Sequence, residues 1–291
     1  MSAVAFQKST IVRAIRPIFR TFEAVAPGPG AVLTERMWCY VPPSRAERAE
    51  QPGERFTVRL NGRDVAAEAW GEGPIVYLMH GWGGRRAQLD GFVHPLLWTG
   101  HRVVTFDAPS HGDSAPGAFG PGRGLLPEFS DALAAVVAVA GPAHGIIAHS
   151  LGASAAALAV LDGLPVSRAV FISPLADPMP YTVEFAKTFG FGEKIRNGFL
   201  RRLELRVGRR MLDFSVPSRA RTHPTPLPSL LVVHDREDKQ THYADGEAIA
   251  AAWPGAHLMT TNGLRHRRIL HDPDVIDAAV SHIATPAHIP A

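Results

Sequence analysis

The chain has 291 residues, of which 46% are hydrophobic and 20% charged, and its formal net charge is +3. Such a length and composition are typical of one large or two small globular domains, and they exclude disorder over most of the chain. Residues 174–214 hold eight Lys/Arg against five Asp/Glu, whereas the rest of the chain holds 22 of each. Because the charge forms no uniform basic stripe, we expect no nucleic-acid partner.

The cysteine count and the hydropathy pattern bear on location. Cys39 is the only cysteine, so no intramolecular disulfide can form, which fits a reducing compartment. The sequence has no run of 18 apolar residues and therefore predicts no transmembrane helix, and its N-terminal apolar stretches are too short for a signal peptide. We expect a cytoplasmic protein in which Cys39 is a small buried hydrophobe. The sequence does not indicate an oligomeric state.

The N-terminal segment is basic, with Lys8, Arg13, Arg16 and Arg20 all preceding the first acid, Glu23. This pattern favours a packed N-terminal helix over a basic amphipathic helix on a membrane surface, although the second alternative stays open. We assign residues 1–53 to an N-terminal extension and residues 54–291 to the main domain.

Hydrophobic patterning from residue 56 onward predicts a sheet. Residues 56–60 and 64–70 flank Asn61-Gly62 and indicate a hairpin with a tight turn. Short apolar runs without alternation, typical of strands buried on both faces, follow at 75–79, 103–106, 145–148, 169–172, 230–233 and 257–260. Helical stretches are expected at about 86–98, 125–140, 151–162, 240–253 and 273–284. The alternation predicts an α/β fold: a mostly parallel eight-stranded sheet with helices on both faces.

One stretch, residues 175–214, interrupts this alternation. Its phenylalanines are spaced as in helices, and an insertion of this size above the carboxyl edge of the sheet is typical of a lid. We therefore take Phe185, Phe189 and Phe199 as candidate substrate-contacting residues. The alternative is a peripheral helical pair that does not contact substrate.

The stretch Ala148-His149-Ser150-Leu151-Gly152-Ala153 carries the strongest chemical signal. It follows an apolar run and opens an alanine-rich helical segment. A serine on a sharp strand-to-helix turn is exposed at the carboxyl edge of a sheet, with the helix N-terminus beside it to stabilise negative charge. Ser150 is therefore the candidate nucleophile, and an ordinary N-cap serine is the structural alternative.

Two other loops contribute to the expected site. After residues 75–79 comes His80-Gly81-Trp82-Gly83-Gly84, and the amides of Trp82 and Leu151 are the candidate oxyanion donors. After residues 103–106 comes a loop in which we interpret Asp107 as a turn-fixing carboxylate, and His111 and Ser114 as loop structure.

The acid and the base are expected after the last two strands. Asp235, Glu237 and Asp238 follow residues 230–233; Asp235 is favoured as a turn residue, and Asp238 is better placed to reach a neighbouring loop. His266 lies in the loop directly after residues 257–260, and His271 is the second candidate. A histidine here would take the proton of Ser150 and return it to the leaving group, while Asp238 fixes its tautomer.

On these residues the chain resembles the α/β-hydrolase superfamily, in its esterase-like branch. The resemblance runs from about residue 54 to 284 and rests on H-G-W-G-G at 80–84, D-A-P-S-H-G-D-S at 107–114, A-H-S-L-G-A at 148–153, H-D-R-E-D at 234–238 and G-L-R-H at 263–266. It implies Ser150 as nucleophile, Asp238 as acid and His266 as base. Ala148 and Arg265 stand where many relatives have glycine, and the H-G-G-G signature of one lipase/esterase branch is absent.

The expected function is hydrolysis of a small carboxylic ester or thioester, with an apolar group, through an acyl-enzyme. Two alternatives remain: hydrolysis of a carbon–carbon bond by the same triad, and a catalytically silent hydrolase fold that binds a ligand. The resemblance implies no cofactor, and the scattered histidines predict no metal site.

Overall fold

The computed structural model describes residues 10–44 and 52–285. They divide into two compact units. The helical unit comprises residues 10–40 and 177–215, and the sheet unit comprises the described residues of 41–176 and 216–285. The N-terminal segment and the insertion expected at 175–214 thus fold together in one unit. Residues 1–9, which carry Lys8, lie outside the described residues.

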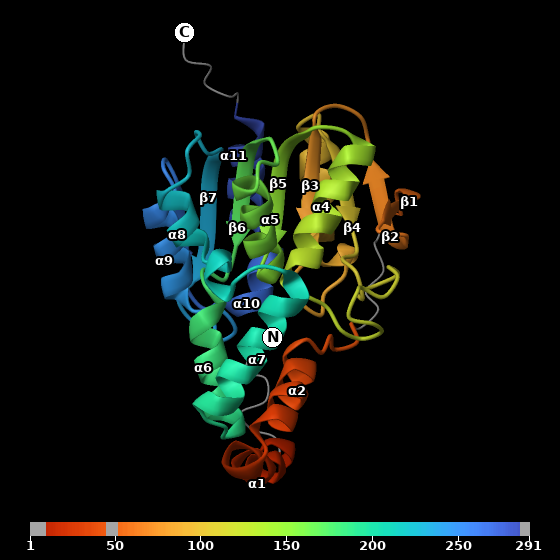
Figure 1. Ribbon diagram of the computed structural model, residues 1–291. Coiled ribbons are helices and arrows are strands. Elements are labelled where there is room, and N and C mark those ends of the chain that lie inside the picture. Colours follow the sequence, from red (N-terminus) through yellow and green to blue (C-terminus); the bar gives the residue numbers. More distant parts are fainter. Residues whose placement is uncertain (1–9, 45–51, 286–291) are drawn as a thin grey trace. The chain divides into compact units, whose positions relative to one another are not determined.

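The sheet unit contains a single eight-stranded sheet (Figure 1). Its strands are β1 (Glu54–Leu60), β2 (Arg63–Trp70), β3 (Ile75–Met79), β4 (Arg102–Phe106), β5 (Ala143–His149), β6 (Val166–Ile172), β7 (Ser229–Asp235) and β8 (His257–Thr261), in the order β1-β2-β4-β3-β5-β6-β7-β8. β2 pairs antiparallel with both of its neighbours, β1 and β4, and all pairings among the six strands β3 to β8 are parallel. The predicted mostly parallel α/β sheet is confirmed.

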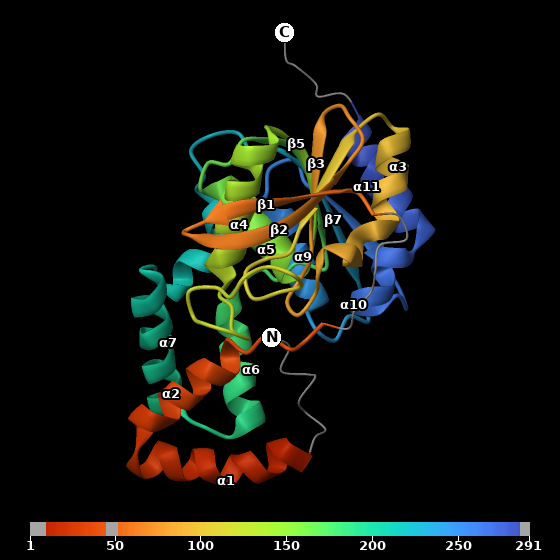
Figure 2. The ribbon, with the colours of Figure 1, turned by 90° about the vertical axis from the view of Figure 1, so that its right-hand side faces the viewer.

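Helices cover both faces of this sheet (Figure 2). One face carries α4 (Leu126–Ala140), α5 (Leu151–Leu161), α8 (Val216–Arg221) and α9 (Tyr243–Ala252); the other carries η2 (Arg86–Phe92), α3 (Val93–Trp98) and α11 (Pro273–Ala284). The short α10 (Arg265–Arg268) and η4 (Ile269–His271) follow β8. Five of the predicted helical stretches therefore form, the first as a 3-10 turn that runs into α3.

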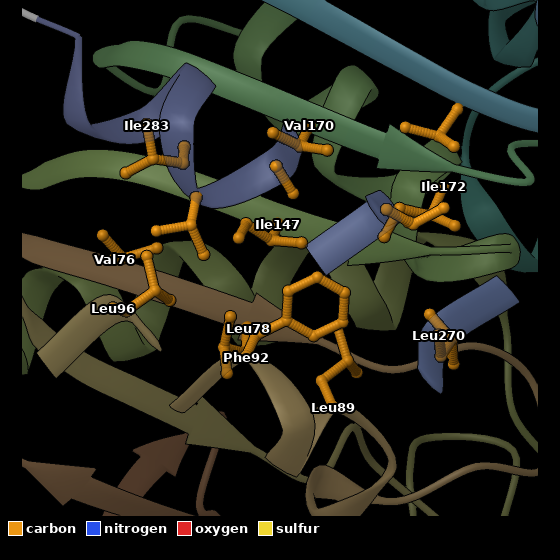
Figure 3. Close-up of a cluster of buried hydrophobic side chains, with 14 of the residues drawn as sticks. Val76, Leu78, Leu89, Phe92, Leu96, Ile147, Val170, Ile172, Leu270 and Ile283 are labelled. Carbon is orange, nitrogen blue, oxygen red and sulfur yellow. The ribbon is translucent and has the colours of Figure 1, made fainter. Parts of the chain in front are cut away.

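The core between the sheet and the η2, α3 and α11 layer explains why the central strands lack alternation (Figure 3). Fully buried aliphatic side chains of β3, β5 and β6 point into it, among them Leu78, Ile147 and Val170. Phe92 and Ile283 close it from the helices. Because helices pack on the opposite face as well, both faces of each central strand must be apolar.

The helical unit has a core of its own. Its helices are α1 (Thr10–Val25), α2 (Pro27–Trp38), α6 (Pro178–Phe189) and α7 (Glu193–Val207), with the 3-10 turn η3 (Met211–Phe214). Phe185, Phe189 and Phe199 are buried here. Phe189 contacts Phe19 with ring centroids 6.1 Å apart, and Trp38 contacts Phe185 and Phe199 at 5.3 and 5.5 Å. Packing inside the unit thus accounts for the three phenylalanines that the sequence suggested as substrate contacts.

Two carboxylates of the N-terminal segment bind the insertion. Glu23 accepts backbone N–H bonds from Gly192, Lys194 and Ile195 at 2.9–3.1 Å, which satisfies the first turn of α7. Glu35, only 1% exposed, accepts from Arg202 Nε at 2.6 Å and from Arg206 Nε at 2.8 Å. These bonds join segments that are about 170 residues apart in the chain.

Two predictions about individual features can be compared with the described residues. Cys39 is buried, as expected of a small hydrophobe. Within residues 10–44 and 52–285, no helix has the length and apolar character needed to cross a membrane.

Candidate active site

Ser150 lies on the sharp turn between β5 and α5. Its backbone has φ +55° and ψ −127°, a conformation that L-residues rarely adopt, and its N–H donates to Ile172 O at 2.9 Å. A Cβ added at Gly152 would meet His80 O at 2.2 Å, so the start of α5 passes directly against the end of β3. In this strained backbone conformation the serine side chain projects from the turn, beyond the carboxyl ends of the strands.

Ala148 replaces the first glycine of the usual motif without disturbing the turn. It is a regular β5 residue paired with Met79 on one side and Phe171 on the other, and it is fully buried. Its φ is not positive, unlike that of Ser150. The motif therefore requires a glycine only at its second position, Gly152.

Three side chains from different loops form a continuous hydrogen-bonded chain. His266 Nε2 lies 2.9 Å from Ser150 Oγ, and His266 Nδ1 lies 2.7 Å from Asp238 Oδ2. The carboxylate can only accept, so Nδ1 carries a proton and Nε2 is left to accept from the serine hydroxyl. His266 and Asp238 are both almost completely buried, which strengthens these bonds.

The surroundings of Asp238 keep it ionised. Its Oδ1 accepts from the N–H groups of Gln240 at 2.7 Å and Thr241 at 3.1 Å, and its Oδ2 accepts from the Thr241 hydroxyl at 3.1 Å. Burial alone would raise the pKa of Asp238, but the interaction with His266 and the hydrogen bonds from these N–H groups outweigh this effect. The pKa therefore lies well below its ordinary value.

The other candidate acids and the second candidate base are located elsewhere. Asp235 accepts from Glu237 N–H, from the Thr261 hydroxyl and from Leu264 N–H at 2.8–2.9 Å, so it ties together the loops after β7 and β8. This is the turn role expected for it. Glu237 is exposed and lies 3.7 Å from Arg265, and His271 is exposed in η4.

The loop after β3 passes against the serine turn. A Cβ on Gly81 would come within 2.8 Å of Ser150 Cβ, so the peptide joining Gly81 to Trp82 lies close beside the serine. The Trp82 ring stacks on Phe129 at 6.1 Å and 18°. Leu151 is the first residue of α5, where backbone N–H groups have no acceptor within the helix. Both amides thus belong to segments that border Ser150 Oγ.

Asp107 and His80 support this arrangement from within the fold. Asp107 accepts from Arg86 N–H at 2.7 Å and from Asp113 N–H at 2.9 Å, and it pairs with the buried Arg86 guanidinium. His80 Nε2 accepts from Ala108 N–H at 3.0 Å, and its Nδ1 donates to Gly81 O at 2.7 Å. These contacts agree with the structural interpretation of Asp107. No sequence motif marks Arg86, and its contacts with several carboxylates were not expected.

Two further buried histidines, which sequence reasoning missed, flank the hydrogen-bonded chain. His149 Nε2 donates to the carbonyl oxygen of His266 at 2.8 Å, and the two rings are 4.7 Å apart. His234 Nε2 lies 3.6 Å from Asp238 Oδ2. Burial lowers the pKa of His149 well below its usual range and that of His234 to about 4, so both rings are neutral at pH 7. Their positions next to Ser150 and Asp235 in the sequence were the available signal.

The Asp238 carboxylate and two neutral histidine rings surround His266 and its hydrogen bonds. Asp238 supplies the negative charge behind His266, while the neutral His149 beside the His266 ring and the neutral His234 beside Asp238 add no positive charge. Such an arrangement can move a proton from the serine hydroxyl to Nε2. Within residues 10–44 and 52–285, no group of three or more His, Cys, Asp or Glu side chains is arranged to hold a metal ion.

Comparison with known proteins gives a family and a fold. A family model described as "Alpha/beta hydrolase family" matches residues 75–279. No curated protein matches the sequence. Many solved structures do, at low identity.

For three of these structures, the part that matches this chain is nearly the whole of their own length. Est1E from Butyrivibrio proteoclasticus, determined with ferulic acid bound, is 18% identical with a TM-score of 0.60, over 79% of this chain and 100% of its own. An esterase from Exiguobacterium antarcticum is 17% identical with a TM-score of 0.58, over 80% and 100%. A meta-cleavage product hydrolase from Pseudomonas fluorescens is 15% identical with a TM-score of 0.58, over 79% and 97%. At such identities the likeness shows a shared fold.

Proposed function

Because the chain belongs to the alpha/beta hydrolase family, we propose that it is a serine hydrolase that cleaves a carboxylic ester or thioester through an acyl-enzyme. The observation that carries the proposal is the hydrogen-bonded chain from Ser150 Oγ through His266 to Asp238. A weak alcohol nucleophile needs an adjacent base, and that base needs an orienting acid.

In the proposed reaction His266 carries the proton through both steps. Ser150 Oγ attacks the carbonyl carbon while its proton passes to His266 Nε2, and Asp238 stabilises the imidazolium at Nδ1. His266 then protonates the departing alcohol or thiol, which leaves an acyl-Ser150. A water molecule, deprotonated by His266, attacks this acyl group and releases the acid and the free serine.

The amides of Trp82 and Leu151 are the proposed donors to the oxyanion of each tetrahedral intermediate. The close approach of Gly81 to Ser150 and the position of Leu151 at the start of α5 support this pair. One well-placed donor accounts for about a 10²–10³-fold acceleration in enzymes of this kind.

The proposed substrate has an apolar acyl or aryl group. The half-buried Trp82 follows the oxyanion turn directly and packs against the buried Phe129 and His111, so the exposed part of its ring gives this turn an apolar surface. Cleavage of a carbon–carbon bond in a diketone acid is the second candidate, since the structurally similar protein from Pseudomonas fluorescens is a meta-cleavage product hydrolase.

Labelling with a fluorophosphonate probe tests the nucleophile. We expect covalent labelling of the wild type and of Ser130→Ala, a control serine on α4 whose hydroxyl donates to Ala155 O. Ser150→Ala should remain unlabelled and lose about 10⁶-fold in kcat. Asp238→Asn should lose about 10⁴-fold, because it favours the wrong His266 tautomer. Equal labelling of a folded Ser150→Ala variant would remove Ser150 from this role.

Substrate comparison separates the two reactions. Turnover of p-nitrophenyl esters that improves with acyl-chain length, without turnover of diketone acids, is the expected result. The reverse preference would assign the carbon–carbon reaction. Labelling at Ser150 with no turnover of either class would contradict both.

A further inference from the structure

Charge is divided unequally between the two units. Residues 10–40 and 177–215, the described segments of the helical unit, hold 12 Lys/Arg against seven Asp/Glu. The described residues of the sheet unit hold 15 Lys/Arg against 18 Asp/Glu. The net charge of +3 for the whole chain therefore combines a basic helical unit with a slightly acidic sheet unit.

Internal bonds of the helical unit occupy much of its negative charge. Glu23 accepts the N–H groups that open α7, and Glu35 is buried against two arginines. Asp177 caps α6 by accepting from Met179 N–H at 2.8 Å. These carboxylates bind partners within the unit, and the unit as a whole keeps an excess of positive charge.

α1 presents an ordered pattern on its two faces. Val12 and Phe19 are buried in the core of the unit. On the outer side, Arg13 and Arg20 are exposed and lie two helical turns apart on one edge. Ile18 and Val25, 50% and 77% exposed, have the same spacing on the other edge.

The residues between these two edges are small. They are Ala14, Pro17, Thr21 and Ala24, and all are exposed. α1 lies across the ends of α2, α6 and α7 (Figure 2), and so its outer side is open along the length of the helix. A helix of this kind can approach a flat surface closely, with arginines along one edge and apolar side chains along the other.

We propose that the outer face of α1 docks on an anionic lipid surface. Arginine side chains along one edge complement acidic headgroups, and Ile18 and Val25 fit the apolar layer just beneath them. A nucleic acid would offer the negative charge without the apolar layer, and an interface with a second copy would bring the same basic edge against itself or against a separate acidic surface. The lipid interface satisfies both edges at once. This docking does not depend on the chemistry at Ser150.

Vesicle co-sedimentation of the full chain tests the proposal. We expect binding to vesicles of 70% phosphatidylcholine and 30% phosphatidylglycerol at low salt, weaker binding at 0.5 M NaCl, and none to phosphatidylcholine alone. Arg13→Glu/Arg20→Glu should lower the partition coefficient by about 25-fold or more, since each surface arginine accounts for roughly fivefold. Ile18→Ser/Val25→Ser should weaken binding and keep its salt dependence.

A matched variant distinguishes docking from bulk charge. Arg63→Glu/Arg221→Glu makes the same change in net charge at exposed positions of the sheet unit and should bind vesicles as the wild type does. Circular dichroism and fluorophosphonate labelling should be unchanged in all variants, so that lost binding reports on the surface and not on folding or on Ser150. The proposal is overturned if the wild type ignores anionic vesicles, or if both charge pairs lose binding equally. A dimer in size-exclusion chromatography that Arg13→Glu/Arg20→Glu disperses, without vesicle binding by the wild type, would assign the face to a second copy.

Discussion

At the scale of single residues, backbone conformation decides which positions of the site tolerate substitution. Ser150 is held at positive φ by the packing of α5 against β3, and Gly152 allows this packing because its missing Cβ makes room for His80 O. Ala148 lies in ordinary strand conformation, so its methyl group is accommodated. The motif was sufficient to locate the turn at Ser150, but only the structure distinguishes the required glycine from the replaceable one.

Arg265 is the second departure from the glycine pattern, and it has a measurable cost. Its φ is +60°, in the left-handed region that favours glycine, and its exposed side chain makes only a 3.7 Å ion pair with Glu237. Such a conformation costs a non-glycine residue about 1 kcal/mol, more than an exposed ion pair contributes. We expect Arg265→Gly to stabilise the protein by about 0.5–1 kcal/mol, observed as a rise in Tm of about 1–4 °C.

Arg265→Ala is the matched control, because it removes the same ion pair and keeps the Cβ. It should be no more stable than the wild type. If the glycine and alanine variants melt at the same temperature, backbone strain at Arg265 does not limit stability.

The buried histidines mark a limit of residue-level prediction. Asp238 and His266 could be selected because each follows a strand whose carboxyl end meets that of β5. His149 ends β5 and His234 lies near the end of β7, yet their pairing with the His266 backbone and with Asp238 depends on side-chain packing across loops. Their sequence positions beside Ser150 and Asp235 place them near the site, but they do not specify these contacts.

At the scale of elements, periodicity identified the strands but not the partners of the outer helices. The apolar runs of β3 to β8 predicted the parallel sheet because both of its faces are buried. The amphipathic pattern of a helix indicates that one of its faces is buried, but it does not identify the segment that packs on that face. The packing of α1 and α2 on α6 and α7, which fills the space around Phe185 and Phe199, was therefore not predictable.

Glu35 is the connection between α2 and α7 that we expect to matter most. Removing it leaves Arg202 and Arg206 without their shared acceptor, although both are about one-third exposed and can regain water. Glu35→Ala should therefore cost about 1–3 kcal/mol, below the range for fully buried pairs. Hydrogen–deuterium exchange should rise in α2 and α7 and stay unchanged in β5 and β6.

Glu193→Ala provides the comparison within the same helix. Glu193 is 70% exposed and pairs with Arg196 three residues on, so its loss should change stability by no more than about 0.5 kcal/mol. Equal exchange in the two variants would show that burial of Glu35 adds nothing to the pair.

At the scale of the whole molecule, buried histidines set the response to acid. Burial lowers the pKa values of six histidines of the sheet unit: His80, His101, His111, His149, His234 and His282. For His111 and His234 the pKa falls to about 3 and about 4. The unfolded chain takes up protons near pH 6.5 while the folded chain does not, so stability is full above that pH and falls as the pH drops toward 4.

Each of these groups adds up to about 1.4 kcal/mol of destabilisation per pH unit inside that window. Urea unfolding between pH 7 and 5, where most carboxylates stay ionised, should show a steep loss of unfolding free energy. His111→Phe keeps an aromatic ring against Trp82 and Phe129 and removes one titrating group. Its slope should be shallower by about that amount, and a slope equal to that of the wild type would contradict the assignment.

The shared core of the helical unit has a practical consequence for anyone choosing where to begin an expression plasmid. A fragment trimmed to the family-matched region, residues 75–279, would keep Ser150, Asp238 and His266. It would also discard Phe19 and Trp38, which contact the phenylalanines of the insertion. These side chains would then be exposed to solvent as an apolar patch that promotes aggregation. Such a fragment would tend to precipitate, and its failure in an enzyme assay would say nothing about the catalytic machinery that it still encodes.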